Sequence, residues 1–273
     1  MDTAFDFASK HTDRTYRISI SLPYAYSKPE NWPFGNKPDR WAVIYLLDAN
    51  FWFGMVTEIV HSMAWCGGTT DAIVVGIGYP EQANPQETWM ETMARRNADF
   101  TPVRNEERQQ SMGEMTKRTV KTGEASRFLQ FLGHELIPAV DHDYLTNPSR
   151  RILAGHSLGG GFAAFALFEA PDLFDAYVIG SCNPVAQDRY ILKCEEAFAQ
   201  RHRKLASKVY LWAGALEEDT DSTTVSETLR FAELLESRHY EGLTVARHIV
   251  ADANHCECVA PGFQSGLKFA LQA

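Results

Sequence analysis

The chain has 273 residues, 45% of them hydrophobic, and a net charge of -9. This length and composition predict one domain over residues 1–273 with a well-buried core, and the acidic balance argues against a nucleic-acid partner, which would need an excess of basic residues. No stretch approaches the roughly 18 apolar residues of a membrane span, and the first residues lack the basic and apolar segments of a secretion signal, so we expect no membrane partner.

The cysteine pattern favours a reduced, cytoplasmic setting. Five cysteines are an odd number, and a chain of this length does not depend on disulfides for stability. The clustered group is His255-Cys256-Glu257-Cys258, but a structural metal site would need further ligands at finger-like spacing, and the sequence contains neither C-x-x-C nor H-E-x-x-H. We therefore predict neither a metal ion nor another cofactor, and the oligomeric state stays open.

Apolar patterning predicts strands and helices that alternate along the chain. Residues 15–22 alternate polar with apolar side chains, as in a half-buried edge hairpin, and turns are expected from Pro29 to Pro38. Continuous apolar runs, typical of strands covered on both faces, follow at 41–48 and 71–77, and further strands are predicted at 151–154, 176–181, 208–214 and 243–250. Helices are predicted at 51–65, 123–140, 162–168, 194–205, 227–238 and 262–271. This alternation implies a mostly parallel sheet with right-handed crossovers.

Residues 81–122 have the least regular pattern of the chain. They contain Trp and Met residues, an arginine pair, and then a charged, glutamine-rich tract. Long excursions of this kind are usually functional or mobile rather than part of the core. We therefore predict that this segment is a long, lid-like excursion over the sheet.

The stretch 151–161 (RILAGHSLGGG) combines a short apolar strand, a serine between glycines, and the start of an alanine-rich helix. In a nucleophile elbow the strained turn excludes bulky residues two positions before and after the serine, and Gly155 and Gly159 fill these positions around Ser157. A G-x-S-x-G pentapeptide arises by chance in many chains, but the strand before it and the helix after it supply the context that the motif requires. We therefore predict that Ser157 is a nucleophile.

A serine hydroxyl needs a base to take its proton, and the imidazole that does so needs a carboxylate to fix its tautomer. After an elbow of this kind the chain order is serine, acid, histidine. His239 lies near a predicted helix end and His248 inside a predicted strand, where structural roles are expected, whereas His255 follows the last strand at the edge where such sites form. His255 is the predicted base, and His156 is expected to pack or orient.

The residues alone do not decide which acidic side chain pairs with the predicted base His255. Four acidic residues follow the predicted strand 208–214, and the simple alternative is that they form a solvated acidic turn: Glu217, Glu218, Asp219 and Asp221. Asp252 is a weaker candidate, because it lies only three residues before His255. One acid of this group is expected to orient the histidine.

Two backbone N–H groups should stabilise the oxyanion of an acyl-transfer reaction. One belongs to the residue after the nucleophile, Leu158, and the other to the loop after the 41–48 strand, at Asn50. Asp48, which precedes that loop, is interpreted as a structural turn residue.

Several stretches together make the chain resemble the esterase D-like branch of the α/β-hydrolases, which includes siderophore esterases of the enterobactin type. The resemblance spans about residues 15–270 and is carried by residues 16–23, 43–50, 74–80 with 95–102, 155–160 and 254–261. It implies the α/β-hydrolase fold, a mostly parallel central sheet with helices on both faces. It also matches Ser157 to the nucleophile, His255 to the base, Glu217 to the acid and Asn50 to the oxyanion loop.

Two departures from the family pattern lie near the expected pocket. Ser181-Cys182-Asn183-Pro184 stands where members commonly have a Ser-Pro pair, and Cys256-Glu257-Cys258 replaces the usual small residues after the histidine. Both departures bear on substrate preference more than on the chemistry.

The sequence therefore predicts a serine carboxylic-ester hydrolase that acts through an acyl-enzyme on small-molecule esters, with siderophore-type esters as one class. Acyl transfer to an alcohol or sugar would use the same residues, so this alternative stays open. A catalytically silent binding protein of the same fold is disfavoured, because all three triad residue types are present in the required order.

Arg95 and Arg96 are predicted substrate-binding residues. In an otherwise acidic chain these two guanidinium groups lie close to Trp89, and guanidinium groups bind carboxylates bidentately and stack on aromatic rings. We hypothesise that they face the pocket mouth and favour anionic or catechol-like esters. Ion pairing with a neighbour such as Asp99, which would only clamp the segment, is an equal alternative.

Overall fold

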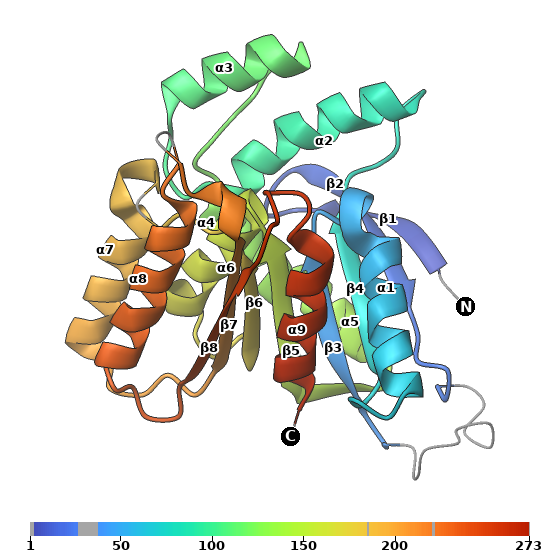
Figure 1. Cartoon of the computed structure of the whole chain (residues 1–273). Coiled ribbons are helices and arrows are strands. Elements are labelled where there is room, and N and C mark those ends of the chain that lie inside the picture. The colour runs from blue at the N-terminus through green and yellow to red at the C-terminus, as the bar shows by residue number, and fades with distance from the viewer. Residues whose placement is uncertain (1–2, 27–37, 185, 220–221, 273) are drawn as a thin grey trace.

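The computed structural model describes residues 3–26, 38–184, 186–219 and 222–272. Within these ranges eight strands form one sheet in the order β1-β2-β4-β3-β5-β6-β7-β8 (Figure 1). β1 and β2 are antiparallel to their neighbours, and the other six strands run parallel to one another. The bounds are β1 (Thr3–Ser9), β2 (Arg14–Ser21), β3 (Trp41–Leu47), β4 (Ala72–Gly78), β5 (Thr146–His156), β6 (Ala176–Gly180), β7 (Lys208–Gly214) and β8 (Thr244–Val250).

Helices cover both faces of this sheet. One face packs against α1 (Ala49–Trp65) and α9 (Val259–Leu271). The other face packs against α4 (Ala125–Phe131), η2 (Leu132–Leu136), α5 (Ile137–Asp143), α6 (Leu158–Glu169), α7 (Ala186–Arg201) and α8 (Thr224–Ser237). No helix in the described ranges is long and apolar enough to cross a membrane.

The central strands are apolar throughout because both of their faces are covered. Along β3, Val43 and Tyr45 point into the core on the α6 side, whereas Ile44 and Leu46 belong to the core beneath α1 and α9. The two strands predicted as continuous apolar runs are fully buried as β3 and β4, and the architecture is the α/β-hydrolase fold that the sequence predicts.

The predicted edge hairpin is present, and its second strand is one that the sequence pattern did not indicate. β2 pairs with β1, which precedes it, from Thr3 opposite Ile20 to Ser9 opposite Arg14. β1 lies at the sheet edge and is mostly exposed, so it lacks the apolar signal of a buried strand. The turns predicted from Pro29 to Pro38 fall almost entirely on residues 27–37, outside the described residues.

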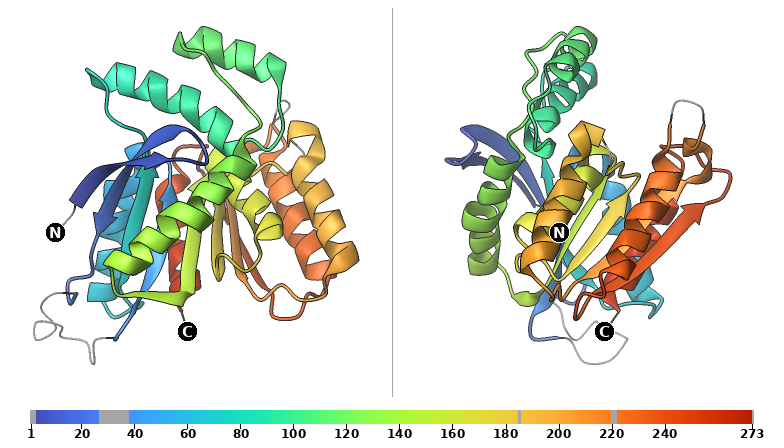
Figure 2. Two further views of the ribbon diagram at one scale, coloured as in Figure 1. Left: turned by 180° about the vertical axis from the view of Figure 1, so that it is seen from behind. Right: turned by 90° about the vertical axis from the view of Figure 1, so that its left-hand side faces the viewer.

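The segment predicted as a long, irregular excursion contains two helices that the sequence pattern did not indicate. α2 (Pro85–Phe100) and α3 (Glu106–Thr116) lie beyond the carboxyl ends of the parallel strands, as Figure 2 shows from two directions. Both helices begin at an asparagine whose side chain accepts a backbone N–H: Asn84 at α2 and Asn105 at α3. The sequence of α3 shows little apolar periodicity, because Thr116 is the one residue that this helix fully buries.

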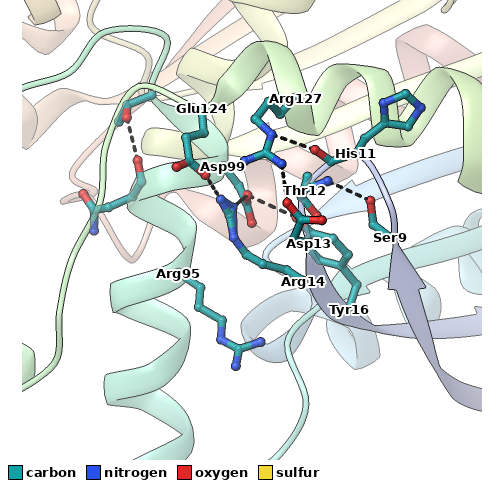
Figure 3. A network of polar contacts seen from close by, with 12 residues as sticks. Ser9, His11, Thr12, Asp13, Arg14, Tyr16, Arg95, Asp99, Glu124 and Arg127 are labelled. Atoms are coloured by element: carbon teal, nitrogen blue, oxygen red, sulfur yellow. Dashed lines mark hydrogen bonds and ion pairs between the residues drawn. The ribbon is translucent and has the colours of Figure 1, made fainter.

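A buried polar network fixes the C-terminal end of α2 to the rest of the fold (Figure 3). Asp99 accepts hydrogen bonds from Arg14 at 2.8 Å, from the Tyr16 hydroxyl at 3.1 Å and from the Tyr79 hydroxyl at 2.9 Å. Arg14 also pairs with Glu124, just before α4. The end of α2 is therefore attached to β2, to the residue after β4 and to the start of α4 at once.

Candidate active site

Ser157 occupies a strained turn between β5 and α6. Its backbone has φ 58° and ψ -122°, and its N–H donates to the carbonyl of Gly180 at 2.8 Å. A Cβ on Gly155 would lie 2.5 Å from the Gly159 carbonyl oxygen, and one on Gly160 would lie 2.4 Å from the Gly180 oxygen. Side chains cannot be accommodated at these positions, so the glycines permit the close strand-to-helix approach that a nucleophile elbow needs.

His255 and Glu217 are brought together from two loops. His255 follows β8, and Glu217 ends the short η3 helix (Ala215–Glu217) after β7. The Nδ1 atom of His255 lies 2.5 Å from Oε2 of Glu217. The Glu217 side chain is buried, whereas the imidazole is 48% exposed. Because the carboxylate holds the proton on Nδ1, the neutral ring presents Nε2 as an acceptor.

The second oxygen of Glu217 is also fully engaged. Oε1 accepts from the Ser181 hydroxyl at 2.7 Å and from the backbone N–H of Gly214 at 2.8 Å, and Cys258 Sγ lies 3.5 Å away. Burial alone would raise the pKa of Glu217, but the hydrogen bonds from His255, Ser181 and Gly214 outweigh it and lower the pKa to about 2. Glu217 is therefore a carboxylate at neutral pH.

This lowered pKa predicts a specific loss of stability in acid. Since the pKa in the folded protein lies below the ordinary value of 4.5, Glu217 stabilises the fold fully above that pH and loses its contribution as the pH falls toward 2. We expect the free energy of unfolding to fall, between about pH 5 and pH 2, by on the order of 3 kcal/mol more in the wild type than in Glu217→Gln. Urea unfolding across this range measures the difference, and parallel curves for the two proteins would contradict it.

The other candidate acids make different contacts. Glu218 is exposed and accepts from the hydroxyl and the backbone N–H of Ser226 on α8. Asp219 accepts from the backbone N–H of Ser222 at 2.8 Å, as in a local turn. Asp252 is an exposed turn residue with φ 54°, and Asp221 lies outside the described residues. Among the candidates that the structure describes, Glu217 is the one that contacts His255.

The three other histidines weighed in the sequence analysis do not contact Glu217. His156 is buried, stacks on Trp212 and lies 3.1 Å from the Ser181 hydroxyl, and its ring centroid is 4.5 Å from that of His255. Burial and the neighbouring His255 lower the pKa of His156 to about 3, so its ring is neutral and packs behind His255. His239 is exposed between α8 and β8, at the opposite edge of the sheet, and His248 is exposed on β8.

Two cavities meet at Ser157 and His255. The larger, of about 510 Å³, has a largely polar lining that includes Asn105, Arg108 and Ser111 from the α3 segment. The smaller, of about 270 Å³, is mostly aromatic and apolar, with contributions from Phe51, Trp52, Trp89 and Met93. A larger hollow of about 740 Å³ lies between β2, α1 and α2, but neither Ser157 nor His255 lines it.

The predicted oxyanion residues both lie in the first turn of a helix. Leu158 begins α6 and Asn50 is the second residue of α1, so their backbone N–H groups have no acceptor within the helix. The Asn50 side chain exchanges hydrogen bonds of 2.9 and 2.7 Å with the backbone of Tyr79, which fixes this loop. Asn50 itself lines the 740 Å³ hollow and is not among the residues that line the two cavities at Ser157, so its oxyanion role stays a prediction. Asp48 before it adopts a left-handed turn with φ 55°, in line with the structural role expected for it.

The contacts of Arg95 and Arg96 favour the anchoring alternative. Arg96 is 7% exposed and donates to both carboxylate oxygens of Asp48, at 2.8 and 2.7 Å. It lines the smaller cavity, but its charge is already paired there. Arg95 pairs with Glu91 at 2.5 Å and donates to the Thr15 carbonyl at 3.3 Å, and it is not among the residues that line the two cavities at Ser157. A substrate-binding role for this pair stays a prediction.

One polar contact at the site was missed in the sequence. Ser181 follows β6 with φ 44°, and its hydroxyl donates to Glu217 while it contacts His156. The sequence signal was the polar residue at the carboxyl end of a strand that neighbours β5 and β7. Among the described residues, no three His, Cys, Asp or Glu side chains are grouped so that they could hold a metal ion.

Comparison with known proteins identifies the family. The family described as "Putative esterase" matches residues 9–256. Ferri-bacillibactin esterase BesA of Bacillus subtilis is 29% identical over 269 residues, which cover 97% of this chain and 87% of that protein. A siderophore enterobactin esterase of Emericella nidulans is 30% identical over 193 residues, 69% of this chain and 60% of the relative.

A solved structure extends the similarity over the whole fold. The BES protein from Bacillus cereus matches with a TM-score of 0.80 and 26% identity, over 100% of this chain and 96% of that one. The sequence and structural relatives agree with one another and with the architecture described above. The chain therefore belongs to this esterase family, together with the siderophore esterases that it resembles, and is a carboxylic-ester hydrolase.

Proposed function

We propose that the protein hydrolyses small-molecule esters through an acyl-enzyme on Ser157, with His255 as the general base and Glu217 as the orienting acid. The observation that carries this proposal is the 2.5 Å contact between His255 Nδ1 and Glu217 Oε2 beside the cavities that Ser157 and His255 share. The strained backbone of Ser157 supports it, because an elbow exposes the hydroxyl at the end of the strand.

In the first half of the reaction, His255 Nε2 takes the proton of the Ser157 hydroxyl as the oxygen attacks the ester carbonyl. The backbone N–H groups of Leu158 and Asn50 donate to the resulting oxyanion. The tetrahedral intermediate collapses, the ester C–O bond breaks, and the protonated His255 gives its proton to the departing alcohol. Glu217 stays ionised throughout and stabilises the imidazolium.

In the second half, His255 takes a proton from a water molecule that attacks the acyl-enzyme carbonyl. The bond between the acyl carbon and Ser157 Oγ breaks, His255 returns the proton to that oxygen, and the carboxylic acid leaves. An alcohol in place of the water would give acyl transfer by the same steps. The deacylating nucleophile therefore decides between hydrolysis and transfer.

Siderophore-type esters are the substrate class that we propose. The named relatives act on ferri-bacillibactin and on enterobactin-type siderophores, and the similarity to the first of them covers 97% of this chain. The two cavities are suited to the two parts of such an ester: a polar one of about 510 Å³ and an aromatic one of about 270 Å³.

A fluorophosphonate probe followed by an ester panel tests this proposal. We expect the probe to label Ser157 in the wild type and not in Ser157→Ala, as shown by peptide mass spectrometry. The panel should run from short p-nitrophenyl esters to a triserine-lactone siderophore, with and without an added alcohol. Absence of labelling together with inactivity on every ester would overturn the proposed activity, whereas ester products in place of acids would reveal acyl transfer.

Replacement of Glu217 by glutamine should lower kcat on the order of 10³-fold to 10⁴-fold, because the amide no longer fixes the imidazole tautomer or stabilises its charged form. Steady-state kinetics on a p-nitrophenyl ester measures the loss. Glu218→Gln is the matched control, since Glu218 binds Ser226 and is expected to keep wild-type kinetics. A large loss in the control with normal activity in Glu217→Gln would reassign the acid.

A further inference from the structure

Helix α3 contributes one wall of the larger cavity at Ser157. Figures 1 and 2 show that α3 lies beyond the carboxyl ends of the parallel strands, next to α2. Its N-terminal half supplies Glu107, Arg108, Ser111 and Met112 to the same cavity that Ser157 and His255 line. A ligand whose ester group lies at Ser157 would therefore meet α3 with its distal part.

The Arg108 side chain is held in place without a counter-charge. Its Nε donates to Oδ1 of Asn97 at 2.6 Å, and Asn97 is fully buried on α2 with its own Nδ2 bound to the Met93 carbonyl at 2.6 Å. Within the described residues, no carboxylate lies within 4.0 Å of the guanidinium, and its Nη1 and Nη2 atoms have no hydrogen-bond partner. The neighbouring Glu107 lines the cavity but forms no ion pair with it among these residues.

The other arginines on and near α2 and α3 are in a different situation. Each of them has a carboxylate partner: Arg95 with Glu91, Arg96 with Asp48, Arg104 with Glu106, and Arg118 with Glu87 and Glu91. Burial, together with the charge of Arg96, lowers the pKa of Arg108. An uncompensated cation of this kind is costly in a partly desolvated wall, and an anion bound beside it relieves the cost.

We propose that Arg108 is a specificity-determining residue that binds an anionic oxygen group of the substrate, a carboxylate or a deprotonated catechol, while the ester carbonyl lies at Ser157. Its Nη1 and Nη2 can donate in parallel to two oxygens, which is the geometry in which guanidinium groups recognise such anions. This inference rests on the proposed esterase activity and deepens it. It transfers the role that the sequence suggested for Arg95 and Arg96 to a different residue.

The test compares two esters with the same leaving group, one neutral and one that carries a carboxylate on its acyl part. In Arg108→Gln we expect the ratio of kcat/KM for the anionic ester to that for the neutral ester to fall about tenfold or more, with most of the change in KM. Arg108→Lys keeps the charge but loses the paired donors, so its ratio should be intermediate. Added salt should lower the ratio in the wild type and much less in Arg108→Gln.

Arg104→Gln is the matched control, because Arg104 lies on the same segment, is 74% exposed at its side chain, and pairs with Glu106 outside the cavity lining. It should leave the ratio unchanged. An equal loss on both esters in Arg108→Gln, or a ratio that does not change, would overturn the proposal. Thermal unfolding of each variant shows whether the fold is kept.

A binding measurement separates this proposal from the proposed activity. If the wild type hydrolyses neither ester, the proposed function fails, and calorimetric titration with 2,3-dihydroxybenzoate and with neutral catechol still tests Arg108. Tighter binding of the carboxylate to the wild type than to Arg108→Gln would support the anion site, and equal binding to both proteins would overturn it.

Discussion

Ser157→Ala is expected to lower kcat for ester hydrolysis on the order of 10⁶-fold, because the residues of such a unit act together and no other group replaces the nucleophile. The change removes one oxygen from a turn whose geometry is set by the surrounding glycines, and the Ser157 N–H keeps its bond to the Gly180 carbonyl. We therefore expect the fold to be kept, as checked by circular dichroism and thermal unfolding.

The decisive measurement is steady-state hydrolysis of a p-nitrophenyl ester by highly purified Ser157→Ala protein. The variant should still hydrolyse the ester roughly 10³-fold faster than the uncatalysed reaction in water, because substrate binding and the oxyanion donors remain. More than a few per cent of wild-type activity in the pure variant would show that Ser157 is not the nucleophile.

His255→Ala should be as damaging as the serine change, because without the imidazole the hydroxyl is not deprotonated and the leaving alcohol is not protonated. Residues that act as one unit are strongly non-additive, so the Ser157→Ala/His255→Ala double variant should be no slower than either single variant. Steady-state kinetics on the same ester measures all three.

His248→Ala and His239→Ala are the controls for this experiment. Both histidines are exposed, one on β8 and one at the opposite sheet edge, and neither lines the cavities at Ser157. We expect near wild-type kinetics from both. An inactive His248→Ala protein together with an active His255→Ala protein would show that His248, and not His255, is the base.

The parts of the fold that could be predicted from the sequence are those with local, repeated signals. β3 and β4 are continuous apolar runs because both of their faces are covered. Such a run can be recognised in the sequence without knowing which elements pack against it. The elbow is equally local, since a side chain at Gly155 would collide with the backbone of Gly159 in the same turn.

The remaining features depend on contacts between distant segments. α3 buries little of its surface, so no apolar period indicates its helix, and the caps at Asn84 and Asn105 become informative only once the helices are known. The residues alone left several acids open, and it was the family resemblance that pointed to Glu217. Its contact with His255 depends on the η3 turn, which brings this carboxylate to a loop 38 residues away. Likewise, the missing counter-charge of Arg108 emerges only when α2 and α3 are packed together.

The two cavities at Ser157 have a consequence for the order in which products leave. They differ in character, one polar and bounded by α3, the other aromatic and bounded by α1 and α2, and they meet at the serine and His255. If Ser157 carries an acyl group that fills one of them, the alcohol can diffuse out of the other while the covalent intermediate persists. The emptied compartment then admits the water that completes the cycle, so the α3 wall would control the lifetime of the acyl-enzyme as well as the choice of ester.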